Sequence, residues 1–164
     1  MYQKFGDNLF DELLVAANES PRKRSHHNIH KDLDEPVQRL CIGLKKGTYV
    51  RPHHHPQKNK WEMMLVLKGA VAVVIFDIDG KVTDKLELSA GGALCGIENE
   101  PNTWHTLFPL SDEAVIMEVK EGPFTPSVAS DFARWAPQEG DDDVNDFLAW
   151  LEQTDIGEQY LKSK

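Results

Sequence analysis

The chain has 164 residues, of which 40% are hydrophobic and 27% are charged, as is ordinary for one soluble globular domain with a substantial core. Its formal net charge of −9 argues against a general nucleic-acid binder, but it leaves open an anionic small molecule held by local arginines. No apolar run approaches the roughly 20 residues that a membrane span needs, and the N-terminus lacks the apolar core of a signal peptide. We therefore expect a cytoplasmic protein with neither a membrane nor a nucleic-acid partner.

The first predicted element is a helix over residues 7–20. Apolar residues recur from Leu9 onward at the spacing of one helical face, and Asp7 is suited to cap the helix. Residues 21–36 are polar and bounded by prolines, which predicts an irregular connection. The basic run at 22–24 within this connection is expected to be a solvated surface.

Short runs rich in β-branched and aliphatic residues follow between Val37 and Val119, separated by turn residues. Asp79-Gly80, between "VVIFDI" and "KVTDKL", is typical of a tight β-hairpin. We count about eight strands at roughly ten-residue spacing, one of them formed by "TYVRPHHH" at residues 48–55. The pattern predicts an all-β protein with an antiparallel barrel or sandwich.

A second helix is predicted near the end of the chain, in "DDDVNDFLAWLEQ" at residues 141–153. An apolar stripe of helical spacing runs along it: Val144, Phe147, Leu148 and Leu151. The predicted organisation is a helix with a connecting segment at 1–36, a β-barrel at 37–120, and a tail with a helix at 121–164 that packs on the barrel.

Two cysteines occur, Cys41 and Cys95, and both stand in apolar surroundings. Reducing conditions in the cytoplasm make free thiols the expected state of both. We therefore predict two buried free cysteines in preference to a disulfide.

Three consecutive histidines occur in "RPHHHPQKNKWE", residues 51–62. If the segment is an extended strand, alternation places His53 and His55 on one face with Arg51, while His54 points away. Two imidazoles directed at one point are a common way to hold a metal ion. The histidine pair is thus a candidate metal site, and Arg51 is a candidate for binding a substrate.

The residues around this pair resemble the first cupin motif, which is a glycine, five residues, His-x-His, a spacer, a glutamate, six residues and a glycine. Gly47, His53, His55, Glu62 and Gly69 follow that order. Six residues separate His55 from Glu62, where the usual cupin has three or four. A longer hairpin loop accounts for the difference without changing the strand face of each ligand.

A histidine of the second cupin motif is matched by His105 in "EPNTWHTLF". Pro101 is displaced by one residue from the motif, and Asn102 stands where a glycine is usual. Asparagine is the residue other than glycine that best tolerates the left-handed conformation of such a turn. The asparagine that often follows this histidine is absent, and Pro109 stands in its place.

Together the two motifs imply a cupin-like antiparallel β-barrel, or jelly roll, with one divalent transition metal. The implied metal ligands are His53, His55, Glu62 and His105. Three imidazoles and one carboxylate suit Zn²⁺, Fe²⁺, Ni²⁺, Mn²⁺ or Cu²⁺ in preference to Ca²⁺. Cupins generally pair, so a homodimer is expected.

More of the chain, from Ser20 to about Trp150, resembles the WbuC-type cupin-fold metalloprotein family. The resemblance is carried by "SPRKR", "NIH", "LDEPVQRL", "GTYVRPHHHP", "VTDKLELS", "PNTWHTL", "EVKEGPF" and "FARWAPQEG". It implies a small metalloprotein of a family often encoded with enzymes of bacterial surface-polysaccharide assembly, without a settled reaction. Its Asn-x-His element makes Asn28 and His30 candidate substrate-binding residues, and His30 a candidate catalytic proton carrier.

Two classes of function remain open on this basis. The first is a metal-dependent enzyme, isomerase-like, epimerase-like or oxygenase-like, that acts on a sugar or another small polar metabolite. The second is a non-catalytic protein that uses the metal to bind a small anionic or sugar ligand. In either case Arg51 clamps an anion or pairs with an acidic residue of the chain.

Overall fold

The computed structural model describes residues 2–161, so Met1 and the last three residues of the predicted tail at 121–164 lie outside the described residues. The elements in chain order are α1 (Asp7–Glu19), β1 (Arg24–Asn28), β2 (Val37–Lys45), β3 (Glu62–Lys68), β4 (Ala70–Phe76), β5 (Val82–Ser89), β6 (Gly96–Asn99), β7 (Trp104–Pro109), β8 (Glu113–Glu121), the 3₁₀ helix η1 (Ala129–Asp131) and α2 (Val144–Gln153).

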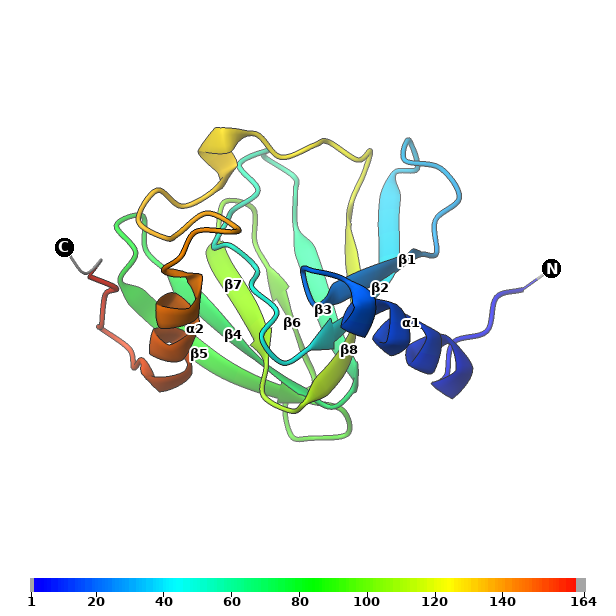
Figure 1. Ribbon diagram of the computed structural model, residues 1–164. Coiled ribbons are helices and arrows are strands. Elements are labelled where there is room, and N and C mark those ends of the chain that lie inside the picture. The colour runs from blue at the N-terminus through cyan, green and yellow to red at the C-terminus, as the bar shows by residue number, and fades with distance from the viewer. Residues whose placement is uncertain (1, 162–164) are drawn as a thin grey trace.

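Within residues 2–161, eight strands form two antiparallel sheets that face each other (Figure 1). One sheet has the order β1-β2-β8-β3-β6, and the other has the order β5-β4-β7. Inward-facing aliphatic side chains of both sheets form the core between them: Leu40, Ile42, Leu44, Met64, Val66, Val71, Val73, Leu88, Leu107, Ala114 and Ile116. The predicted all-β barrel with a helix near each end is confirmed.

Each sheet has its outer face covered by one helix. In α1, Phe10 and Leu13 pack against Cys41 of β2 and Val115 of β8. In α2, Phe147 lies in a second cluster with residues of β4 and β7. Neither helix of the described range is long and apolar enough to cross a membrane.

The sequence predicted Asp7 as the cap of helix α1, but the cap lies one residue earlier. Asp7 is its first residue, and Gly6 occupies the cap position without a side-chain hydrogen bond. Asp7 still favours the helix, because a carboxylate in the first turn interacts well with the helix dipole.

The connection predicted at 21–36 was wrong in one respect, since it contains the strand β1. Residues 24–28 pair with β2, with Arg24 opposite Leu44 and His26 opposite Ile42. Because both partners face the barrel interior, Arg24 and His26 also face inward, and only 8% of the Arg24 side chain is exposed. The prediction of a solvated basic run therefore fails at Arg24.

The strand predicted at 48–55 is also absent, because this part of the described chain is an extended loop with a single bridge residue, His53. Pro52 and Pro56 flank the three histidines and lack the N–H that a strand ladder requires. The loop is held instead by contacts on both sides, with β7 and with the segment after β8.

The hairpin predicted at Asp79-Gly80 joins β4 and β5. Gly80 has a φ of +89°, and its N–H donates to the Asp77 carbonyl at 3.1 Å. A Cβ at this position would lie 2.5 Å from the Trp135 ring, so both the backbone conformation and the close packing require glycine.

The two cysteines differ in exposure, which corrects the prediction that both are buried. Cys41 is free and buried beneath α1, and burial raises the pKa of its thiol. Cys95 is free but exposed, because it lies in the turn between β5 and β6 rather than in a sheet.

We therefore expect a thiol reagent such as Ellman's reagent to modify one cysteine of the folded protein rapidly and the second only on unfolding. Absorbance would follow the reaction with and without denaturant. Cys95→Ser removes the fast phase and Cys41→Ser retains it. Equal rates for the two thiols in the folded protein would contradict this assignment.

Candidate metal centre

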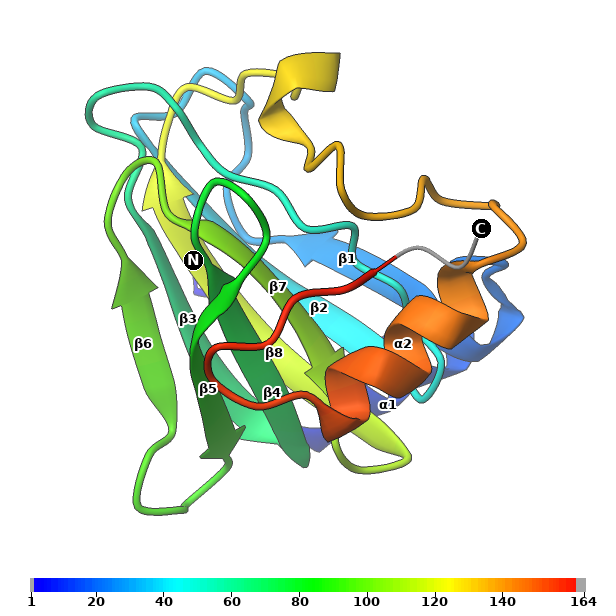
Figure 2. The ribbon, with the colours of Figure 1, turned by 90° about the vertical axis from the view of Figure 1, so that its left-hand side faces the viewer.

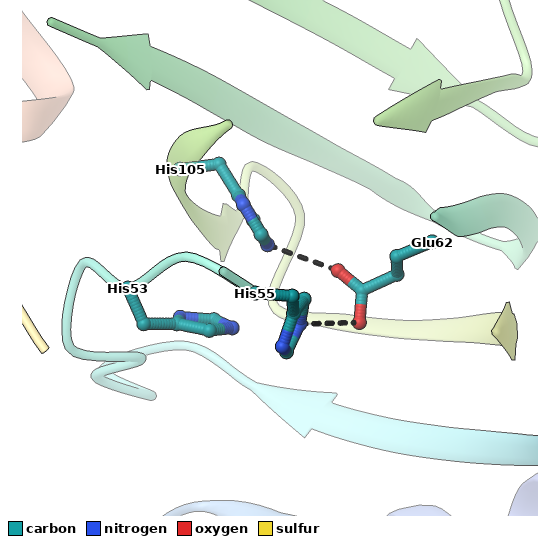
Figure 3. Close-up of side chains that lie close together, drawn as sticks. All are labelled: His53, His55, Glu62 and His105. Carbon is teal, nitrogen blue, oxygen red and sulfur yellow. Dashed lines mark hydrogen bonds and ion pairs between the residues drawn. The ribbon is translucent and has the colours of Figure 1, made fainter. Parts of the chain in front are cut away.

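Four side chains that lie apart in the sequence meet at one end of the barrel (Figure 3). His53 and His55 come from the loop before β3, Glu62 is the first residue of β3, and His105 is the second residue of β7. One donor atom from each side chain lies within 4.8 Å of the others. The structure thus brings together the four predicted ligands.

Backbone hydrogen bonds hold the histidine loop against β7. The N–H of His53 donates to the carbonyl of His105 at 3.0 Å, and the N–H of His105 donates back at 2.9 Å. The N–H of Asn102 donates to the carbonyl of His55 at 2.8 Å. Asn102 has a φ of 70°, which agrees with the left-handed conformation predicted for it.

Backbone carbonyls also orient two of the imidazole rings. His53 Nδ1 lies 3.0 Å from the carbonyl of Arg51, and His105 Nδ1 lies 2.9 Å from the carbonyl of Thr103. A carbonyl can only accept, so Nδ1 carries the proton in both rings and Nε2 is directed to the cluster. In each case the carbonyl of the residue two positions earlier fixes the ring so that Nε2 is the nitrogen available to a metal.

Glu62 lies between two of the histidines. Its Oε2 is 2.9 Å from His105 Nε2, and its Oε1 is 3.3 Å from His55 Nε2. Although burial acts to raise the pKa of Glu62, the hydrogen bonds with His105 and His55 hold it well below the usual range. Burial likewise acts to lower the pKa of His105, but its hydrogen bond with Glu62 raises it.

His53 has the opposite behaviour to His105. Burial, and then the neighbouring His105, lowers the pKa of His53 to about 3. The ring is therefore neutral near pH 7, with a free lone pair on Nε2. Neutral imidazole is the form that binds a metal ion.

His54 points away from the cluster, as alternation predicted. Its Nδ1 donates to Asn102 Oδ1 at 2.7 Å, and its ring stacks on Trp104 with centroids 3.8 Å apart. This histidine supports the loop from its outer side and provides a natural control for the other two.

A cavity of about 850 Å³ opens beside the cluster, between the two sheets. Its polar wall includes the four clustered residues and the predicted substrate-binding residues Asn28, His30 and Arg51. Its apolar wall comes from both sheets: Leu40, Ile42, Leu44, Met64, Leu107 and Ile116. The volume is that of a small-molecule binding site.

Arg51 is held at the cavity wall by the segment after β8. Its Nη2 donates to the Ala133 carbonyl at 2.6 Å, and its guanidinium lies 5.5 Å from the centre of the Phe132 ring. Within residues 2–161 no acidic side chain pairs with Arg51, and its buried Nε has no hydrogen-bond partner. The role of Arg51 as an anion clamp stays a prediction.

His30 is a second cavity residue with an unused polar atom. It is 6% exposed, and its Nδ1 lies 3.0 Å from the backbone N of Arg39. Its buried Nε2 has no partner among the described residues. An unpaired nitrogen in a cavity wall is suited to a hydrogen bond with a ligand.

Glu118 and Lys120 are cavity residues that the sequence reasoning missed. Both come from β8, where Lys120 lies opposite Glu62 and Glu118 opposite Met64. Lys120 Nζ is 2.6 Å from Glu118 Oε1 and 3.6 Å from Glu62 Oε1. The available signal in the sequence was their two-residue spacing from Ile116, which places all three side chains on the inward face of the strand.

These two groups are largely withdrawn from water and pair with each other. Burial, and then the charge of Glu62, raises the pKa of Glu118. Burial acts to lower the pKa of Lys120, but the neighbouring Glu118 and Glu62 raise it. Lys120 thus remains a cation that compensates the two carboxylates.

Solved structures of other proteins have folds similar to that of this chain. KdgF from Halomonas sp. has a TM-score of 0.50 and 18% identity, covering 65% of this chain and 84% of its own. Oxalate oxidase in complex with glycolate has a TM-score of 0.53 and 21% identity, covering 74% of this chain and 63% of its own. An RmlC-like cupin with a double-stranded β-helix fold, from Methanocaldococcus jannaschii, has a TM-score of 0.47 and 16% identity, covering 61% and 81%.

At these identities the likeness concerns the fold alone. Residues 5–88 match the family model described as a domain of unknown function, DUF6016, and the chain belongs to this family. No curated protein matches the chain in sequence. The narrower WbuC-type resemblance stays a prediction.

The ion pair of His105 with Glu62 makes stability in the metal-free protein depend on pH. A pKa of His105 raised above 6.5 adds stability that is present below pH 6.5 and is lost as pH rises through the folded-state pKa. Glu62, with its lowered pKa, stays ionised throughout. We expect Glu62→Gln to be more destabilising at pH 6 than at pH 9, measured by urea unfolding with a chelator.

Glu113→Gln is the matched control, because Glu113 pairs with Lys45 and Lys68 and not with a histidine. Its effect is expected to be the same at both pH values. If the effect of Glu62→Gln were equally independent of pH, His105 would not be protonated against Glu62.

Proposed function

We propose that the protein binds one divalent transition metal through His53, His55, Glu62 and His105 and uses it to hold a small polar metabolite in the adjoining cavity. The carrying observation is the convergence of three imidazoles and a carboxylate, within 4.8 Å, at the end of a cavity of about 850 Å³. Three imidazoles and one carboxylate with converging donor atoms suit a first-row divalent metal, which favours a metal over a purely structural polar network.

The donor set fits a metal of the Zn²⁺, Fe²⁺, Ni²⁺ or Mn²⁺ kind. With bonds of about 2.1 Å, two ligands on opposite sides of an ion are about 4 Å apart. The observed spread of up to 4.8 Å therefore needs shifts of less than about 1 Å to close on an ion. The rings of His53 and His105 are already oriented by backbone carbonyls, which reduces the cost of ordering them.

Bound there, the metal would act as a Lewis acid that polarises a carbonyl or hydroxyl oxygen of the ligand. The chain's own groups orient that ligand. Arg51 offers an unpaired Nε, and His30 offers an unpaired Nε2. Lys120, held between Glu62 and Glu118, provides a cation beside the cluster.

Charge favours an anionic ligand. The cavity wall carries four cationic side chains, Arg22, Arg24, Arg51 and Lys120, and three carboxylates, Glu62, Glu118 and Glu139. This local excess of positive charge, in a chain with a net charge of −9, increases further with a divalent metal. The glycolate complex of oxalate oxidase shows a small anion bound by a protein of similar fold.

Catalysis is the first form of the proposal, as isomerase-like, epimerase-like or oxygenase-like chemistry on a sugar or small acid. His30 and Glu118 are its candidates for moving a proton, because both line the cavity and both are buried. Non-catalytic binding is the second form. Two observations favour this second form. Glu118 is engaged in an ion pair with Lys120, and His30 has no charged partner that would tune it as an acid or base.

Elemental analysis of protein purified without a histidine tag tests the metal site. We expect about one metal ion per chain, lost in His53→Ala/His55→Ala because two of the four ligands are gone. His54→Ala is the matched control, since it changes the neighbouring histidine that points away.

Retention of the metal in the double variant would place it elsewhere. If wild-type protein held no metal, even after reconstitution with each metal in turn, the proposed function would be refuted. Loss from His54→Ala as well would mean that the loop itself had been disrupted, so circular dichroism accompanies each variant.

The two forms are separated by incubating metal-loaded protein in D₂O with glycolate and with a set of aldose phosphates. Exchange of a carbon-bound proton, followed by NMR, supports an isomerase or epimerase, and uptake of oxygen supports an oxygenase. Binding without either reaction supports the non-catalytic form. The association with polysaccharide assembly and the homodimer rest on the family resemblance alone.

A further inference from the structure

An arginine pair lies in the cavity wall apart from the candidate metal centre. Arg24 is on β1, faces the interior, and has only 8% of its side chain exposed. Arg22 precedes the strand and is 54% exposed. Both line the same cavity as the four clustered residues, but neither contributes to the proposed metal ligation.

The arginine pair holds one carboxylate, that of Glu139. Arg22 donates from Nε to Oε2 at 2.8 Å and from Nη2 to Oε1 at 2.7 Å, which is a two-bonded fork. Arg24 donates from Nη2 to the same Oε1 at 2.6 Å. Paired donors of this kind match the geometry of a carboxylate or a phosphate.

Glu139 is suited to leave this position. It follows the Pro137 carbonyl, which accepts from the Tyr49 hydroxyl at 2.7 Å, and it precedes α2 in a segment without regular structure. Its side chain is 39% exposed and has no part in the hydrophobic clusters. Its departure therefore breaks ion pairs but displaces no core residue.

Two guanidinium groups against one carboxylate leave an excess of positive charge. Arg24 also donates to the carbonyl of Tyr49, and that bond keeps its guanidinium in place when Glu139 moves. Burial lowers the pKa of Arg24, which reflects the cost of holding a cation there and favours the arrival of an anion. The arrangement is a built anion site with a carboxylate of the chain in it.

The arginine pair and the candidate metal centre are close enough for one small molecule to contact both. Tyr49, whose carbonyl accepts from Arg24, is four residues before His53, and four residues span at most about 14 Å. Arg51 comes between them in the sequence and lines the same cavity. The apolar side chains of Leu40 and Ile42 line the same cavity.

We infer that Arg22 and Arg24 form an anion subsite for the far end of the ligand, and that Glu139 occupies this subsite until the ligand displaces it. The ligand class is then an elongated metabolite with a metal-binding oxygen at one end and a carboxylate or phosphate at the other. This inference rests on the proposed function for the metal-binding end only.

Calorimetric titration of metal-stripped protein with inorganic phosphate, and separately with acetate, tests the subsite at constant ionic strength. Removing the metal prevents anions from binding at the metal centre. In wild type the Glu139 carboxylate competes with phosphate, so the apparent affinity for phosphate is the intrinsic affinity multiplied by the fraction of molecules in which the subsite is open. Glu139→Gln is therefore expected to bind phosphate at least tenfold more tightly than wild type. Acetate shows whether a carboxylate gains as well.

Glu35→Gln is the matched control, because it frees Arg39 from an ion pair that does not line the cavity. Its phosphate affinity is expected to equal that of wild type. Adding Arg24→Gln to Glu139→Gln should abolish the gain. If that double variant fails to fold, Arg22→Gln/Glu139→Gln replaces it, since Arg22 is the more exposed arginine.

Equal phosphate affinity in wild type, Glu139→Gln and Glu35→Gln, which is adventitious anion binding only, would overturn the inference. So would a gain that survives loss of either arginine. Metal content of Glu139→Gln is measured in parallel. A metal missing from wild type as well would refute the proposed function, whereas the phosphate titration decides the subsite by itself.

Discussion

The reciprocal backbone hydrogen bonds between His53 and His105 hold the arrangement at this end of the barrel together. They join a loop with little regular structure to β7, and so to the three-stranded sheet. The same loop bonds on its other side to the segment after β8, through the Asp131 carbonyl and the Ala133 N–H. That segment crosses the same end of the barrel in both views (Figures 1 and 2).

This three-layered contact explains how residues of different character share one cavity. The histidine loop brings two imidazoles, and β3 and β7 bring Glu62 and His105. The segment after β8 brings Phe132 and Glu139 to the cavity wall, with Phe132 beside His53 and Arg51. Polar side chains from the loops and strands and aliphatic side chains of the two sheets therefore line the same cavity.

The grouping of the four clustered residues could be predicted because their spacing resembles that of the two cupin motifs. His53, His55 and Glu62 lie close along the chain, and the turn at Asn102 fixes the entry of His105 into β7. The roles of Arg24 and Glu139 could not be predicted, because their contact joins residues 115 positions apart. It depends on the path of a segment with no periodic pattern.

Errors of the sequence reasoning have physical causes as well. Short polar strands such as β1 lack an alternating apolar pattern, because one side of β1 faces a polar cavity and the other is exposed. The segment with the three histidines had the composition of a strand, but its two prolines prevent ladder bonds. Cys95 was predicted to be buried because the residues next to it in the sequence are apolar. It is exposed because this connection between β5 and β6 is not covered by other parts of the fold.

The distribution of the four clustered residues along the chain has a consequence for the order of folding events. His105 follows His55 by 50 residues, so the cluster is complete only after the long-range pairing of β4 with β7. Contacts of such large sequence separation form late and slowly in folding. An ion bound by all four residues would therefore act mainly on the native state, slowing its unfolding rather than speeding its formation.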